Sequence, residues 1–204
     1  MAVATLAVTA MPAGAGSRLV RGPSKVIIDI TSATGSGCSP DTVEVELKAS
    51  SDPFSIGYAR YVAQAGGPSS PTDSHKNCEV GLRVRFPHRF VYAVSQVRYR
   101  GYANLMNGAS ALHKGSFYLQ GATDGSVITH KVPSGPRGSW MFTDTVPDPQ
   151  LVWTRCGEER LLYLRTELQL DQGTSDPKKA SIVSMNSLGE TPGTTYQLVW
   201  KECP

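Results

Sequence analysis

The 204-residue sequence is poor in charge, has no long apolar run, and lacks the short motifs that accompany common enzyme classes. Only 18% of its residues are charged and 40% are hydrophobic, which excludes a disordered chain and a coiled coil. No apolar run reaches the roughly 18 residues that a spanning helix needs, so we expect no transmembrane segment. The net charge of +3 is too small to imply a nucleic-acid partner, and we expect none.

Motifs for catalysis and for metal binding are also missing. The chain has no G-x-S-x-G turn, no H-E-x-x-H helix, no phosphate-binding loop and no dinucleotide fingerprint. The four histidines are scattered, and no cysteines stand at the short spacing that zinc sites use. We therefore predict no catalytic residue, no metal and no cofactor. A hydrolase assembled from distant positions is the lowest-ranked alternative, and a deep pocket with two convergent titratable groups would reveal it.

The N-terminal stretch is uncharged and rich in small and apolar residues. Ala2–Gly16 contains the segment Ala13–Ala15, a small-x-small pattern typical of signal-peptidase sites. An apolar first strand is the alternative, but no polar residues alternate here as a surface strand requires. We predict a secretory signal over 1–15, a flexible lead-in over 16–24 and one domain over 25–204.

The four cysteines support the same secreted, extracellular location. An even number of cysteines behind a secretory signal indicates two disulfides. Three connectivities are possible, and we favour Cys38–Cys78 with Cys156–Cys203 because each bond would join a strand opening to a later strand in the same half. Each bond would close a loop of about 40 to 50 residues, worth about 4 kcal/mol in the chain-entropy model.

The hydrophobic pattern predicts strands from end to end. Thr42–Lys48 and Cys78–Phe86 alternate between apolar and polar residues, which is typical of half-buried strands. Leu161–Leu170 also fits a helical period, but its strict alternation favours a strand. With 20 Gly and 14 Pro as turn formers, we predict an all-β fold, a jelly-roll-like antiparallel β-sandwich of about a dozen short strands.

Local irregularities refine this prediction. In Arg89–Tyr99 the apolar positions shift register midway, which indicates a β-bulge near Ser95. Asn107–Gly108 and Asp124–Gly125 lie between strand-like runs and favour hairpin turns. The other expected strands are the KVIIDIT run that starts at Lys25, Phe54–Val62, Val127–Val132, Trp140–Thr145, Leu151–Thr154, Ile182–Met185 and Thr195–Lys201.

Positive charge is concentrated in one stretch. Between His75 and Lys114 there are seven basic residues and one acid, a local charge of +6. If the two strands in this stretch pair, four guanidiniums line one sheet face and form a surface for an anionic partner. Outward positions of any sandwich strand are polar, so charge alone does not establish a site. The predicted binding residues on this face are Arg83, Arg85, Arg98, Tyr99, Arg100 and Tyr102.

The neighbouring residues predict different environments for the three tryptophans. Trp153 and Trp200 each lie three residues from a cysteine, so we predict that they belong to the core beside the disulfides. Trp140 follows the turn residues 135–138, and we predict that it is exposed and contributes to binding.

Several motifs resemble those of a family of small secreted proteins from fungi and soil bacteria, catalogued as a domain of unknown function. The resemblance spans Val26 to Cys203. It rests on Gly35-Ser36-Gly37-Cys38, Lys76-Asn77-Cys78, Tyr99-Arg100-Gly101-Tyr102, Trp153 with Cys156-Gly157, and Trp200 with Cys203. The family often has Gly-Cys-Pro where this chain has Cys38-Ser39-Pro40. The resemblance implies secretion, disulfides and a β-rich fold, and no activity.

The sequence therefore predicts a monomeric, non-catalytic secreted protein that binds an extracellular glycan or another protein through its basic and aromatic face. The alternative is an inhibitor of secreted hydrolases that presents the loop Gly66–Asp73 to a protease cleft.

Overall fold

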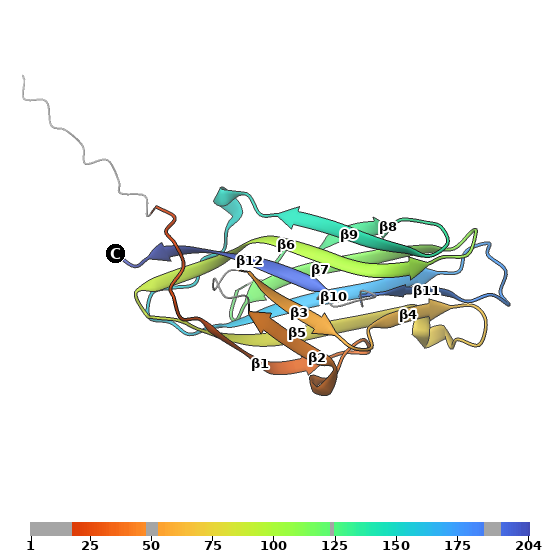
Figure 1. The fold of residues 1–204 in the computed structure, drawn as a ribbon, viewed down its shortest axis with the longest axis horizontal. Helices are drawn as coiled ribbons and strands as arrows, with labels where there is room; N and C mark the ends of the chain where they lie inside the picture. Colours follow the sequence, from red (N-terminus) through yellow and green to blue (C-terminus); the bar gives the residue numbers. More distant parts are fainter. Residues whose placement is uncertain (1–17, 48–52, 123–124, 186–192) are drawn as a thin grey trace, which may run out of the picture.

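The computed structural model describes residues 18–47, 53–122, 125–185 and 193–204 as two antiparallel β-sheets. The expected signal segment 1–15 and the turn residue Asp124 lie outside the described residues. Figure 1 shows the strands running close to the long axis, with the two sheets overlapping in this view. The described residues contain no α-helix and only three short 3₁₀ turns: η1 (Pro40–Thr42), η2 (Pro71–Ser74) and η3 (Asp148–Gln150).

Among the described residues, twelve strands build the two sheets, in line with the dozen or so that the sequence predicted. The five-stranded sheet has the order β1 (Ile27–Thr34), β5 (His75–Arg85), β10 (Leu161–Asp171), β7 (Ser110–Leu119) and β8 (Ile128–Val132). The seven-stranded sheet has the order β2 (Val43–Leu47), β3 (Phe54–Tyr58), β12 (Thr194–Glu202), β6 (Phe90–Asn104), β11 (Ser181–Ser184) and β4 (Val62–Ala65), with β9 (Gly138–Thr145) paired to β6.

The central strands follow from strict alternation between buried apolar and outward-facing polar residues. In β10 the leucines at even positions are buried and the residues at odd positions face outward, so Leu164 and Leu168 enter the core while Arg165 does not. A helix would scatter these leucines around its circumference, whereas a strand places them on one face. The predicted strand over Leu161–Leu170 is confirmed.

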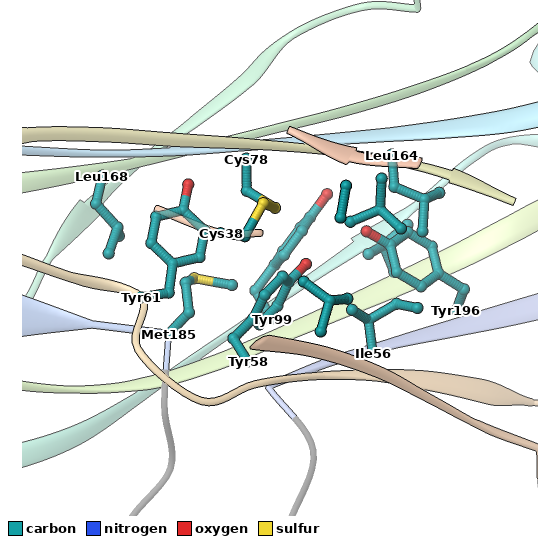
Figure 2. Packing of buried hydrophobic residues seen from close by; sticks show 14 of the residues in the cluster. Cys38, Ile56, Tyr58, Tyr61, Cys78, Tyr99, Leu164, Leu168, Met185 and Tyr196 are labelled. Carbon is teal, nitrogen blue, oxygen red and sulfur yellow. A yellow bond between two sulfur atoms is a disulfide. The ribbon is translucent and has the colours of Figure 1, made fainter. Parts of the chain in front are cut away.

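Aromatic rings fill much of the space between the sheets. Figure 2 shows Tyr58, Tyr61 and Tyr99 between the ribbons, near the Cys38–Cys78 disulfide. The Tyr61 hydroxyl donates a hydrogen bond to the Thr166 carbonyl at 2.7 Å. A buried phenol thus spans from one sheet to the other and keeps its polar atom satisfied.

Both favoured disulfides are confirmed. Cys38–Cys78 joins the segment after β1 to β5, and Cys156–Cys203 joins the segment after η3 to the C-terminal end of the chain. The β-bulge is also confirmed, because Gln96 and Val94 face consecutive residues of β12 and leave Ser95 unpaired in the ladder.

Three details differ from the sequence prediction. Phe54–Val62 is not one strand: β3 pairs with β2 and β12, whereas β4 begins at Val62 and pairs with β11. Leu151–Thr154 is not a strand, although the Thr154 amide donates to the Tyr92 carbonyl at 2.9 Å. The turn at Asn107–Gly108 is not a hairpin, because it joins β6 to β7 and these strands lie in different sheets.

Candidate ligand-binding groove

The predicted arginine face does not form. β5 pairs with β1 and β10, whereas β6 pairs with β12, β9 and β11, so these two consecutive strands belong to different sheets. Arg83 and Arg85 therefore lie on the outer face of the five-stranded sheet, and Arg98 lies on the outer face of the seven-stranded sheet. The prediction was wrong because charge patterning does not reveal which neighbouring strand crosses the sandwich.

Tyr99 and Trp140 are core residues, with 2% and 4% of their surface exposed. Alternation along β6 directs Tyr99 and Gly101 inward, while Arg98, Arg100 and Tyr102 face outward. A side chain at Gly101 would collide with the Trp140 ring, so this glycine makes room for the indole. The placement of these two aromatic residues on a binding surface is therefore corrected.

The other two tryptophans differ from each other. Trp200 is 1% exposed and packs edge-on against Phe86, as predicted for a core residue. Trp153 is only half-buried, and the Lys201 ammonium lies 4.2 Å from the centre of its ring. Trp153 is therefore not the core residue that its distance from a cysteine predicted.

The outer face of the five-stranded sheet contains a hollow of about 500 Å³. Its floor consists of outward residues from neighbouring strands, among which Glu79 on β5 lies opposite Arg165 on β10, and Arg165 lies opposite Ser116 on β7. The next outward row contains Glu167 opposite Lys114. This first hollow is lined by Thr34, Gly35, Asn77, Cys78, Glu79, Lys114, Gly115, Ser116, Val127, Arg165, Thr166 and Glu167.

A second hollow of about 680 Å³ continues along the same strands. It is lined by Ser74, His75, Ser110, Leu112, Lys131, Gln169, Leu170 and Asp171. The two hollows adjoin, because His75 Nε2 in the second lies 2.8 Å from the Glu167 carboxylate in the first. We call the two hollows together the polar groove.

Ion pairs hold the charged side chains of the first hollow in place. Glu79 pairs with Arg165, and Lys114 Nζ lies 3.0 Å from the Glu167 carboxylate. Partial burial raises the pKa of Glu167, but hydrogen bonds from Lys114 and His75 outweigh this effect and leave the pKa below its usual value. The Glu167 carboxylate is therefore held in its ionised form.

A pair of tyrosines lies beside two residues of the first hollow, Arg165 and Glu79. The rings of Tyr118 and Tyr163 stack with centroids 5.0 Å apart, and the Arg165 guanidinium lies 4.8 Å from the centre of the Tyr118 ring. The Tyr118 hydroxyl also donates to the Glu79 carboxylate at 3.0 Å. Aromatic rings and charged side chains thus form one connected network.

The sequence contains a signal for part of this groove. The alternation that predicts a strand over Leu161–Leu170 also places Tyr163, Arg165 and Glu167 together on the outer side of that strand. The rest of the groove depends on the pairing of β10 with β5 and β7. Glu79 and Arg165 are 86 residues apart in the chain, and no local pattern shows that they meet.

A separate polar cluster is enclosed between the sheets. His113 is fully buried beside Tyr99, and neither ring nitrogen has a hydrogen-bond partner among the described residues. Burial lowers the pKa of His113 to about 3, with a smaller contribution from His130. Within the described part of the chain, no three metal-ligating side chains cluster together.

Fold and groove together define a disulfide-bonded β-sandwich with a polar hollow on one outer face. Residues 24–203 match the family described as "Domain of unknown function (DUF4360)", and the chain belongs to this family. An "Uncharacterized secreted protein" of Arthroderma benhamiae (strain ATCC MYA-4681 / CBS 112371) is 28% identical over 182 residues, covering 89% of this chain and 73% of the relative. The chain described in this structure is likewise a secreted protein, as its two disulfides also indicate. Over the described residues, no helix is long and apolar enough to cross a membrane.

Two viral structures also align with the chain at low similarity. The enzymatically active domain of bacteriophage CBA120 tailspike protein 4 is 14% identical with a TM-score of 0.24, over 92% of this chain and 21% of that chain. The chain thus spans about a fifth of the tailspike. The structure of Broad Bean Stain Virus is 9% identical with a TM-score of 0.23, over 98% of this chain and 91% of that chain. Similarities at this level carry no argument about function.

Proposed function

We propose that this secreted protein is a non-catalytic binding protein for an extracellular glycan, and that the polar groove is its binding site. The observation that carries the proposal is the pair of adjoining hollows on one sheet face, lined by carboxylates, cations and amides. Such side chains offer both donors and acceptors to sugar hydroxyls. Tyr118 and Tyr163 add aromatic surface beside Arg165 and Glu79 of the first hollow.

The two groove glutamates support binding better than hydrolysis. A glycosidase needs one carboxylic acid whose raised pKa lets it donate a proton, with a second carboxylate nearby. Here Glu79 pairs with Arg165, and Glu167 has a lowered pKa. Both carboxylates therefore serve as hydrogen-bond acceptors.

Pull-down on insoluble chitin, cellulose, β-glucan and peptidoglycan tests the proposal. We expect the wild-type protein to be retained by at least one of these polymers. Tyr163→Ala and Arg165→Ala should reduce the retained fraction at least tenfold, because both side chains belong to the groove network. Thermal unfolding of each variant checks that the fold is intact.

Variants on the opposite face provide the matched control. Arg98→Glu and Arg100→Glu change the seven-stranded sheet, where the charge pattern of the sequence predicted part of the site. We expect these two variants to bind like the wild type. Loss of binding in them, with normal binding by the groove variants, would move the site to the other sheet and overturn the proposal.

The inhibitor alternative is tested separately. The loop Gly66–Asp73 runs into η2, where the Asp73 carboxylate accepts a hydrogen bond from the Ser70 amide at 3.0 Å. Slowing of a secreted protease at micromolar protein concentration would support that role, and unchanged protease rates would remove it.

A further inference from the structure

The charges of the polar groove balance, and this balance bears on the class of glycan that fits. The lining contains three carboxylates and three cations, with His75 counted as neutral: Glu79, Glu167 and Asp171 against Lys114, Lys131 and Arg165. The chain as a whole carries +3, so the groove is less positive than the rest of the molecule.

The cations of the first hollow are already engaged. Arg165 pairs with Glu79, and Lys114 pairs with Glu167. The side chains of Lys114, Glu79 and Glu167 are 27–29% exposed and that of Arg165 is 44% exposed, so the two carboxylates are partly withdrawn from water. An anionic ligand that approached either cation would also meet the adjacent carboxylate at close range, and like charges repel strongly in such a setting.

Uncharged sugar hydroxyl groups are not repelled by these carboxylates. Glu167 accepts from Lys114, His75 and Gln169 through Oε1, and Glu79 accepts from Arg165 and Tyr118 through Oε2. The second oxygen of each carboxylate offers further lone pairs, and a guanidinium has five donor N–H groups. A sugar hydroxyl can therefore donate to a carboxylate while it accepts from the paired cation, without any change in net charge.

On these grounds, and resting on the glycan-binding function proposed above, we infer that the polar groove selects uncharged polysaccharides and rejects anionic ones. The ligand class is a neutral hexose or N-acetylhexosamine polymer such as a glucan or chitin. Recognition uses hydrogen bonds to the ion-paired rows, so retention survives high salt, which screens exposed charges.

A charge-switch experiment tests this inference. Wild-type protein and the double variant Glu79→Gln with Glu167→Gln are applied to insoluble β-glucan, cellulose, chitin and cross-linked polygalacturonate at low and high salt. The wild type should be retained by a neutral polymer with less than about a threefold change between about 50 mM and 1 M salt, and should flow through polygalacturonate. The double variant removes two negative charges beside Arg165 and Lys114, so we expect at least a tenfold gain in retention on polygalacturonate that high salt abolishes.

Glu44→Gln with Glu46→Gln is the matched control. Both of these glutamates are exposed on β2 of the other sheet, so the same change in total charge occurs away from the groove. We expect no gain on polygalacturonate from this variant, and thermal unfolding confirms that both double variants fold.

Each remaining outcome is decisive. Salt-sensitive retention of the wild type on polygalacturonate overturns the selection of neutral polymers and leaves glycan binding in place. An equal gain by the β2 control, or no gain by the groove variant, overturns the role of the groove charges. Failure of the wild type to bind any of these four polymers or peptidoglycan overturns the proposed function itself.

Discussion

The imidazole of His130 on β8 lies 3.0 Å from the carboxylate of Asp144 on β9, and this contact joins an outer strand of one sheet to an outer strand of the other. Both side chains are largely buried, with 18% and 11% of their surface exposed. The pair closes one side of the sandwich and lies next to the stacked ring of Phe142.

Removal of this contact should weaken the sandwich. We expect Asp144→Ala to lower the free energy of unfolding by about 2 to 3 kcal/mol, because it leaves a buried imidazole without its partner. Urea denaturation at pH 7 measures the change. Glu158→Ala is the control, since Glu158 is 43% exposed at the surface, where it pairs with Arg155 and Arg160, and its loss should cost less than about 1 kcal/mol. Equal losses in the two variants would contradict the structural role of the cross-sheet pair.

His113 should make the protein sensitive to acid. Burial lowers its pKa from 6.5 to about 3 in the folded state. The unfolded chain therefore binds more protons than the folded chain between these pH values, so stability is complete above about pH 6.5 and falls as the pH drops toward 3. The loss from this residue is on the order of 5 kcal/mol.

The matched measurement compares wild type with His113→Leu. We expect the free energy of unfolding of the variant to fall less steeply between about pH 6.5 and 4, with His130 and Asp144 left unchanged nearby. Parallel pH profiles for the two proteins would mean that His113 does not carry the acid sensitivity.

The glycines of the sheets should differ sharply in their tolerance of a methyl group. At Gly101 a Cβ would collide with the Ser184 carbonyl and the Trp140 ring, so we expect Gly101→Ala to cost about 2 kcal/mol or more. At Gly57 the nearest neighbour is the Glu44 Cβ at 3.9 Å, and Gly57→Ala should be neutral or slightly stabilising. Thermal unfolding of the two variants measures this contrast, and a similar Tm for both would argue against the packing of Trp140 on Gly101.

Removal of either disulfide should lower the stability of the fold, but only one of the two removals should weaken glycan binding. Replacing either pair with alanine should cost about 2 to 5 kcal/mol, because each closes a long loop. Cys78 lines the first hollow, so we expect loss of Cys38–Cys78 to weaken glycan retention as well. Loss of Cys156–Cys203 should leave retention unchanged at a temperature where the variant is folded. Equal retention by both variants would show that the first disulfide does not shape the groove.

Features that depend on local pattern were predictable from the sequence, and features that depend on distant contacts were less so. The alternation in Cys78–Phe86 and Leu161–Leu170, the bulge at Ser95 and the two disulfides were all predicted and are present. The strand β7, which forms part of the groove floor, was predicted only as a strand-like run without bounds between the turns at Asn107–Gly108 and Asp124–Gly125. The exposure of Trp140 was predicted wrongly, because the loop before it gave no indication that the indole packs over a glycine of β6.

The sequence by itself determined most of the strands and the inward or outward side of their residues, since the period of two is a property of the local backbone. Only the tertiary structure decided which strands are neighbours. Pairing depends on how each connection crosses between the sheets, and the few residues between β5 and β6 are compatible with a hairpin or with a crossing. For that reason Arg83 and Arg98 were predicted to share one sheet face, whereas in the structure they lie on the outer faces of two different sheets. For the same reason Glu79, Arg165 and Lys114, which come from three distant segments, meet in one groove.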